Sequence, residues 1–204
     1  MYFALVYYPQ VGVENIDAFR RRYDPTASVI EAHMAVMFPV PASVGLQFLV
    51  EHIETALRAW SPFSIHLKGF SKSHDHWLFL TVDKGRAEVI ELFEQIYTGR
   101  IAEYRRHDID FNPHVGLGLF IREDVRYDMS SGGVQREDLD EPRYREALRE
   151  ARSLNLDFES RVDKLDLVEL PAEILDWAFG KRAHPPDDER VVTRREFTLQ
   201  GEVR

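Results

Sequence analysis

One short pattern occurs twice in the 204-residue sequence and constrains the fold more than any other feature. A histidine is followed by an apolar, a small and a second apolar residue, at His33-Met34-Ala35-Val36 and, 81 positions later, at His114-Val115-Gly116-Leu117. Alternate side chains of a strand point to opposite faces, so each histidine shares a face with the small residue. The apolar face must be buried, which leaves the histidine face for a cleft rather than for the main core.

The segments around this pattern predict an α+β protein. Short runs rich in β-branched and aromatic residues predict strands over 2–8, 32–38, 64–69, 77–83, 113–121, 162–170 and 193–199. Apolar residues at helical spacing predict helices over 14–24, 43–60, 86–97 and 143–153, with Ser43 as the cap of the second. Polar composition predicts surface loops at 129–141 and 180–190. The alternation favours antiparallel sheets with outer helices, in a single domain of two similar lobes over 1–204 with a central cleft.

Composition argues against several classes of function. The chain contains no cysteine, which excludes disulfides, thiolate metal sites and cysteine nucleophiles. A formal net charge of −9 argues against long duplex nucleic acid as a partner, because such binding needs a large positive surface. No run of about 18 apolar residues is present, and the N-terminus lacks the basic flank of a signal peptide. We therefore expect a cytoplasmic protein without a membrane partner, and a monomer is favoured.

Two imidazoles that converge on one site suit the chemistry of phosphate esters. A neutral histidine takes a proton from the attacking hydroxyl or water, and a protonated histidine delivers one to the leaving oxygen. Both forms are accessible near neutral pH because the unperturbed pKa of histidine is about 6.5. The residues alone therefore predict two facing imidazoles, an arrangement that can open a cyclic phosphodiester without a metal. His33 and His114 would share the roles of base and acid, and the sequence does not say which residue is which.

At these residues the chain resembles the two-histidine (2H) phosphoesterase superfamily, which includes RNA 2′-5′ ligase-like proteins and cyclic nucleotide phosphodiesterases. The resemblance rests on both histidine motifs, their spacing, Pro39 after the first, Pro113 before the second, and the order of the helices. It implies a two-lobed fold with pseudo-twofold symmetry. It also implies that the substrate is a phosphate ester of a nucleotide or of an RNA terminus, and that no cofactor takes part.

The sequence departs from that family at two positions. Family members carry Thr or Ser two residues after each histidine, where the hydroxyl hydrogen-bonds the phosphate, whereas this chain carries Ala35 and Gly116. Each lost hydrogen bond is worth about 0.5–1.5 kcal/mol. If both act only in the transition state, their loss lowers the rate by about one to two orders of magnitude. Gly116 and Gly118 leave the floor of the second motif open. Candidates to bind the phosphate instead are backbone N–H groups, Lys68, Tyr104, Arg105 and Arg106.

Several alternatives stay open at the level of the sequence. A second function is a catalytically weak or inactive module that binds a phosphate-containing ligand or an RNA end, which the loss of both hydroxyls favours. The His-Asp-His run at 74–76 is a metal site or, more often, a solvated hairpin tip. The arginine runs at 20–22 and 105–106 grip a nucleotide phosphate or, more often, lie on a solvated helix face. Base stacking and core packing compete for Tyr7, Phe38, Trp60 and Trp77, and core packing is favoured for the two tryptophans.

Overall fold

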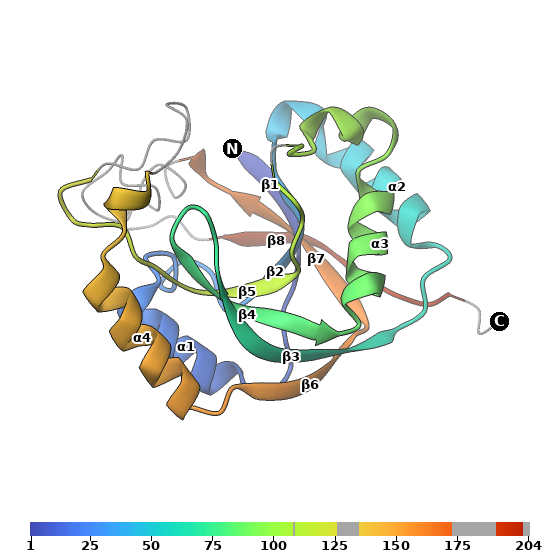
Figure 1. Cartoon of the computed structure of the whole chain (residues 1–204). Coiled ribbons are helices and arrows are strands. Elements are labelled where there is room, and N and C mark those ends of the chain that lie inside the picture. Colours follow the sequence, from blue (N-terminus) through green and yellow to red (C-terminus); the bar gives the residue numbers. More distant parts are fainter. Residues whose placement is uncertain (108, 126–134, 173–190, 202–204) are drawn as a thin grey trace.

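The computed structural model describes residues 1–107, 109–125, 135–172 and 191–201. Within them, two four-stranded sheets have the strand orders β2-β1-β7-β8 and β5-β4-β3-β6 (Figure 1). All strand pairs in both sheets are antiparallel. The strands are β1 (Tyr2–Tyr7), β2 (Met34–Pro41), β3 (Phe63–Lys72), β4 (Trp77–Lys84), β5 (His114–Leu119), β6 (Asp157–Val162), β7 (Lys164–Leu170) and β8 (Val192–Thr198). The α-helices are α1 (Val13–Tyr23), α2 (Leu46–Leu57), α3 (Arg86–Ile96) and α4 (Glu141–Ser153).

This architecture confirms the predicted α+β fold with antiparallel sheets and outer helices. Figure 1 shows α1 beside α4 at one end of the molecule and α2 beside α3 at the other, with the strands between them. Apolar side chains from both sheets and from the helices form one large core, which includes Leu5, Ile53, Leu80 and Phe93. Among the described residues, no helix combines the length and the apolar character that a membrane span requires.

Three predicted boundaries differ from the structure. The second helix begins at Leu46 rather than at Ser43, because residues 42–44 form a 3-10 turn and Gly45, with φ of 94°, is the N-cap. The strand predicted over 162–170 is interrupted at Asp163, so that its first residue closes β6 and the rest forms β7. Of the predicted loop at 129–141, residues 135–141 are described and contain a 3-10 turn before α4 begins. The predicted loop at 180–190 lies outside the described residues.

The two motif strands are edge strands that meet in the middle of the molecule. β2 is the edge of the first sheet and β5 is the edge of the second. The two strands contact each other, although they are not paired through a ladder of hydrogen bonds. His33, which immediately precedes β2, and His114, which begins β5, are therefore carried to the junction of the two sheets.

Candidate active site

Each motif histidine is tied to its own backbone in the same way. Nδ1 of His33 lies 2.8 Å from the carbonyl oxygen of Glu31, and Nδ1 of His114 lies 2.5 Å from the carbonyl oxygen of Asn112. A carbonyl oxygen only accepts hydrogen bonds, so Nδ1 carries the proton in both rings. In the neutral imidazole this leaves Nε2 unprotonated and able to accept a proton. The repeated sequence pattern thus produces a repeated geometry, with the residue two positions earlier as the tether.

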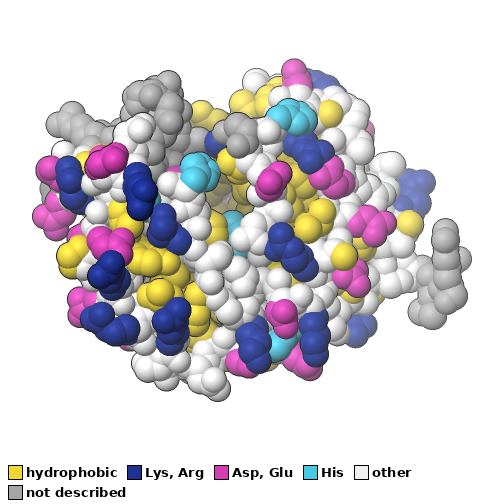
Figure 2. All heavy atoms as spheres, in the orientation of Figure 1, with side chains coloured by type: hydrophobic (Ala, Val, Ile, Leu, Met, Phe, Trp, Pro, Cys, Tyr) yellow, Lys and Arg dark blue, Asp and Glu magenta, His cyan; other side chains and the backbone are white. Residues whose placement is uncertain are grey.

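The structure brings the two imidazoles into one electrostatic environment. Burial in the site lowers the pKa of His33 and of His114 from 6.5 to about 4. The charge of His33 contributes to the lowered pKa of His114, which is an effect expected between rings that lie near each other. In the orientation of Figure 1, the surface of the molecule has a hollow with hydrophobic and histidine side chains inside it and at its edge (Figure 2). The sheet junction therefore carries two mostly neutral imidazoles, and the charge of His33 acts on His114.

Aromatic side chains that the sequence did not place near the histidines surround them. Phe79 of β4 stacks on His114 with ring centroids 3.5 Å apart, and the ring of Tyr8 meets His33 edge-on at 6.3 Å. A Cβ atom added to Gly116 would lie 3.6 Å from the nearest carbon of Trp77. The alternation in 77–83 places Trp77 and Phe79 on one strand face. This alternation does not reveal that the strand pairs with the second motif. The sequence therefore could not place Trp77 and Phe79 beside His114.

Ala35 and Gly116 lie on the strand faces that carry the histidines. Ala35 pairs with Val6 across the first sheet, and Gly116 pairs with Phe79 across the second. The expectation that Gly118 opens the floor of the site is wrong. Gly118 is buried, and a Cβ atom there would lie only 2.6 Å from the Cβ atom of Tyr23, because α1 packs directly against this part of β5.

The structure does not bring the other predicted phosphate ligands to the histidines. Lys68 forms an ion pair with Asp157 of β6 at 2.7 Å. The guanidinium of Arg105 binds the carboxylate of Glu94 on α3, and Tyr104 packs against the core. No described contact links these three side chains to either histidine. Their role as substrate ligands stays a prediction that the geometry does not favour.

The 74–76 run does not form a metal site with other described residues. His76 is 2% exposed, and its Nε2 lies 2.8 Å from the carbonyl oxygen of Gln135. His74, in contrast, is exposed at the tip of the β3–β4 hairpin. Within the described ranges, no group of three or more His, Asp or Glu side chains is arranged to hold a metal ion.

Two groups of side chains have structural rather than surface roles. Tyr7 is fully buried and hydrogen-bonds the Ser160 hydroxyl at 2.6 Å, and the Trp60 indole N–H donates to Gln95, so both belong to the core. In the arginine run at 20–22, the first residue fits neither predicted role, that is, neither phosphate binding nor a solvated helix face. Arg20 is 1% exposed, so it neither lies on a solvated face nor reaches a ligand directly.

The lowered histidine pKa values predict that the protein loses stability in acid. Between about pH 6.5 and pH 4 the unfolded chain binds protons on His33 and His114 that the folded protein does not bind, so the free energy of unfolding falls as the pH falls. The full difference in pKa corresponds to about 3 kcal/mol per histidine, which partial exposure to solvent reduces to about 1–2 kcal/mol. Urea unfolding at pH 7 and pH 4 measures this loss. The same pH dependence in a His33→Asn/His114→Asn variant would contradict the assignment.

Comparison with known proteins places these features in a family. Residues 8–172 match the model of the 2′-5′ RNA ligase superfamily. A Bacillus licheniformis protein with the provisional name of phosphoesterase is 22% identical over 133 residues, which cover 63% of this chain and 77% of that protein.

Two solved structures share the fold. The TT0787 protein of Thermus thermophilus superposes with a TM-score of 0.57 at 15% identity, covering 100% of both chains. Escherichia coli LigT in complex with 3′-AMP superposes with a TM-score of 0.53 at 12% identity, covering 97% of both chains. The family match spans most of the chain and includes both histidine motifs. This chain therefore belongs to the 2′-5′ RNA ligase superfamily, as its resemblance to the two-histidine phosphoesterases implied.

Proposed function

We propose that this protein is a metal-independent phosphoesterase that opens a cyclic phosphodiester at a nucleotide or at an RNA end. The observation that carries the proposal is the matched pair of His33 and His114. Each ring has its Nδ1 proton held by a backbone carbonyl, each leaves Nε2 available, and their charges are coupled across the sheet junction. Two such rings form a general base and a general acid. The proposal includes a cytoplasmic, monomeric enzyme without a cofactor.

The reaction follows from these two Nε2 atoms. One neutral ring accepts a proton from water as the water oxygen bonds to phosphorus. The bond between phosphorus and one ribose oxygen breaks, and the protonated ring delivers its Nε2 proton to that leaving oxygen. The ring that acted as base ends with the proton that the other ring lost, so one proton transfer through solvent restores the starting state. Throughout, the Glu31 and Asn112 carbonyls accept the Nδ1 protons and stabilise each imidazolium in turn.

The lowered pKa values require that the substrate itself helps to protonate the site. With pKa values near 4, both rings are neutral at pH 7, whereas the reaction needs one neutral and one protonated ring. An anionic phosphodiester between the rings favours the imidazolium and raises its pKa. Substrate binding is thus linked to the uptake of a proton, and the active protonation state forms in the complex.

The relatives and the aromatic side chains support a nucleotide as the substrate. Escherichia coli LigT, which shares the fold, has been crystallised with 3′-AMP and with NADP+. In this chain, Trp77 and Phe79 lie beside the second motif, and Trp77 is partly exposed. Aromatic side chains stack on nucleobases with little dependence on the base. A nucleoside that carries the cyclic phosphate therefore fits the surroundings of the histidines.

The proposal is tested by incubating the protein with 2′,3′-cyclic AMP in the presence of EDTA. We expect the ³¹P NMR signal of the cyclic ester to be replaced by that of a 2′- or 3′-monophosphate, at a rate that EDTA does not change. Activity that EDTA abolishes would contradict the metal-independent mechanism. A second function, a binding module without turnover, is favoured by Ala35 and Gly116, which lack the hydroxyls of the family. Tight binding of 3′-AMP with no turnover of any cyclic nucleotide would establish it instead.

A further inference from the structure

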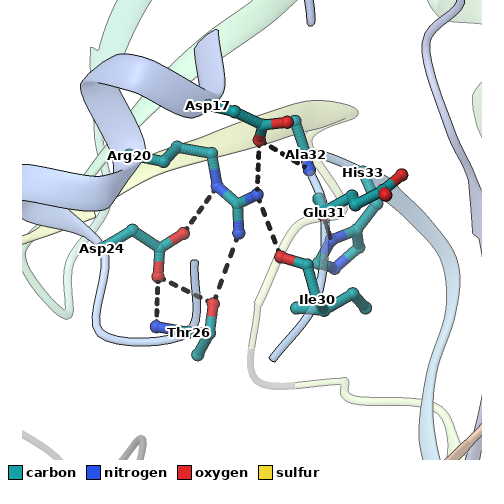
Figure 3. A network of polar contacts seen from close by, with 8 residues as sticks. All are labelled: Asp17, Arg20, Asp24, Thr26, Ile30, Glu31, Ala32 and His33. Atoms are coloured by element: carbon teal, nitrogen blue, oxygen red, sulfur yellow. Dashed lines mark hydrogen bonds and ion pairs between the residues drawn. The ribbon is translucent and has the colours of Figure 1, made fainter. Parts of the chain in front are cut away.

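A buried ionic cluster lies directly behind the first histidine motif. The guanidinium of Arg20 on α1 lies 2.8 Å from the carboxylate of Asp24 and 3.1 Å from that of Asp17 (Figure 3). Asp24 in turn accepts hydrogen bonds from the backbone N–H and the hydroxyl of Thr26, both at 2.7 Å. Removing a guanidinium from water is costly unless its donors are satisfied by well-placed acceptors. The cluster is therefore a fixed unit rather than an ordinary surface ion pair.

The cluster holds the backbone that leads into the motif at two points. Arg20 donates a hydrogen bond to the carbonyl oxygen of Ile30 at 3.1 Å. Asp17, one turn earlier on the same helix, accepts a hydrogen bond from the backbone N–H of Ala32 at 3.1 Å. The ion pair between buried Arg20 and partly exposed Asp17 thus anchors the residues on both sides of position 31.

The anchored segment contains the atom that orients the histidine. Glu31 lies between the two anchor points, and its carbonyl oxygen accepts the Nδ1 proton of His33 (Figure 3). Fixing Ile30 and Ala32 fixes the direction of that carbonyl, and with it the plane and the tautomer of the ring. After burial, the charge of Arg20 is the strongest influence that lowers the pKa of His33, while Asp24 and Asp17 raise it. Geometry and charge therefore act on the same side chain.

The second motif has no equivalent cluster among the described residues. The carbonyl oxygen of Asn112 tethers His114. The side-chain oxygen of Asn112 accepts a hydrogen bond from Arg86, which is exposed on α3. The fold is similar around the two histidines, but only the first is backed by a buried cation. This asymmetry is not required by the packing of a symmetric pair of strands.

We propose that Arg20, held by Asp17 and Asp24, is a positioning residue that fixes the ring of His33 and maintains its neutral form for proton transfer. The inference rests on the proposed function in one respect, namely that His33 moves a proton. The other titratable groups near His33 are Glu31, whose backbone carbonyl tethers the ring, Tyr8, whose ring meets it edge-on, and His114, whose pKa the charge of His33 lowers. None of these groups connects α1 to the ring.

The test is an NMR titration of the His33 Cε1–H signal in the unliganded full-length protein. Arg20→Met removes the cation with little change in volume, and we expect the pKa of His33 to rise by roughly one unit. Asp17→Asn removes an opposing charge while its amide oxygen still accepts from Ala32, so the pKa should fall. A purely structural role does not produce shifts of opposite sign. Arg21→Met, an exposed arginine on the same helix, is the matched control and should change nothing.

Kinetics supply the second measurement. For 2′,3′-cyclic AMP we expect Arg20→Met to lower kcat about tenfold or more with KM nearly unchanged, and Arg20→Lys to recover part of the loss, because Lys keeps the charge but not the fork of donors. A folded Arg20→Met protein with an unaltered His33 pKa would overturn the proposal, as would equal shifts of one sign in both variants. If Arg20→Met does not fold, the Asp17→Asn titration decides. Because the titration needs no turnover, failure of the proposed function leaves this test intact.

Discussion

Replacing His114 with Ala is expected to lower the turnover of 2′,3′-cyclic AMP by about 10²–10⁴-fold, and replacing His33 with Ala should have an effect of the same size. Each ring supplies one of the two proton transfers, and no other described side chain with a titratable nitrogen is tethered at the sheet junction in the same way. KM should also rise in the variant that lacks the ring protonated on binding, because that imidazolium attracts the anionic phosphodiester in the ground state. Initial rates over a range of substrate concentrations separate the two constants.

The double variant gives the sharper result. If the histidines act as one unit, His33→Ala/His114→Ala should be no slower than the slower of the single variants, whereas independent contributions would multiply. His74→Ala is the matched control, because His74 is exposed at the hairpin tip and no described contact joins it to either ring. Turnover that survives in either single variant at the wild-type rate would show that the reaction does not depend on this pair. Loss of activity in His74→Ala would instead show that His74 itself takes part in the reaction.

The positions of the two histidines could be predicted because the evidence for them is local. At 114–117 a period of two separates His114 and Gly116 from Val115 and Leu117, and burial of the apolar pair determines where the others point. The same alternation predicts that His33 and Met34 point to opposite faces of the first motif strand. The meeting of β2 with β5 is a matter of tertiary structure, and the repeated pattern only suggested it.

Arg20 shows why other parts of the site could not be predicted. Three consecutive arginines on a helix are typical of a solvated face, and nothing in the local pattern distinguishes the first from the next two. Its burial depends on Asp24 one turn later and on the carbonyl of Ile30, whose position is set by a turn of the chain after the helix. Phe79 was missed for a related reason, because its contact with His114 depends on a strand pairing whose register shifts by a bulge between Leu78 and Phe79.

β6 was missed because its sequence is mainly polar. Asp157–Val162 has few apolar residues, yet it pairs along β3 from Phe63 to Lys68. Its stability comes from that ladder and from the burial of Ser160 and Val162 rather than from strand propensity. An edge strand of this kind carries little signal of its own, so only its partner strand could be predicted.

Restoring a hydroxyl to each motif is expected to raise turnover by about one to two orders of magnitude. Ala35→Ser and Gly116→Ser each return one hydrogen-bond donor to the face that carries the histidine, and each bond is worth about 0.5–1.5 kcal/mol. Serine is preferred to threonine at position 116 because of Trp77. A Cβ atom there already lies in ordinary van der Waals contact with the indole at 3.6 Å, and an added methyl group would press against it.

Alanine at each of the two positions is the control for this gain in turnover. Gly116→Ala adds the Cβ atom and its restriction of the backbone without the hydroxyl, and the wild-type Ala35 serves the same purpose at the first motif. We expect Gly116→Ala to keep the wild-type kcat while Gly116→Ser increases it, and the two serine effects should add in free energy if each hydroxyl binds a different phosphate oxygen. Equal rates in Gly116→Ala and Gly116→Ser would mean that the phosphate is already held by other groups. A wild type without activity that gains turnover only in the double serine variant would show that the acid–base pair is intact and that the missing hydroxyls alone silence it.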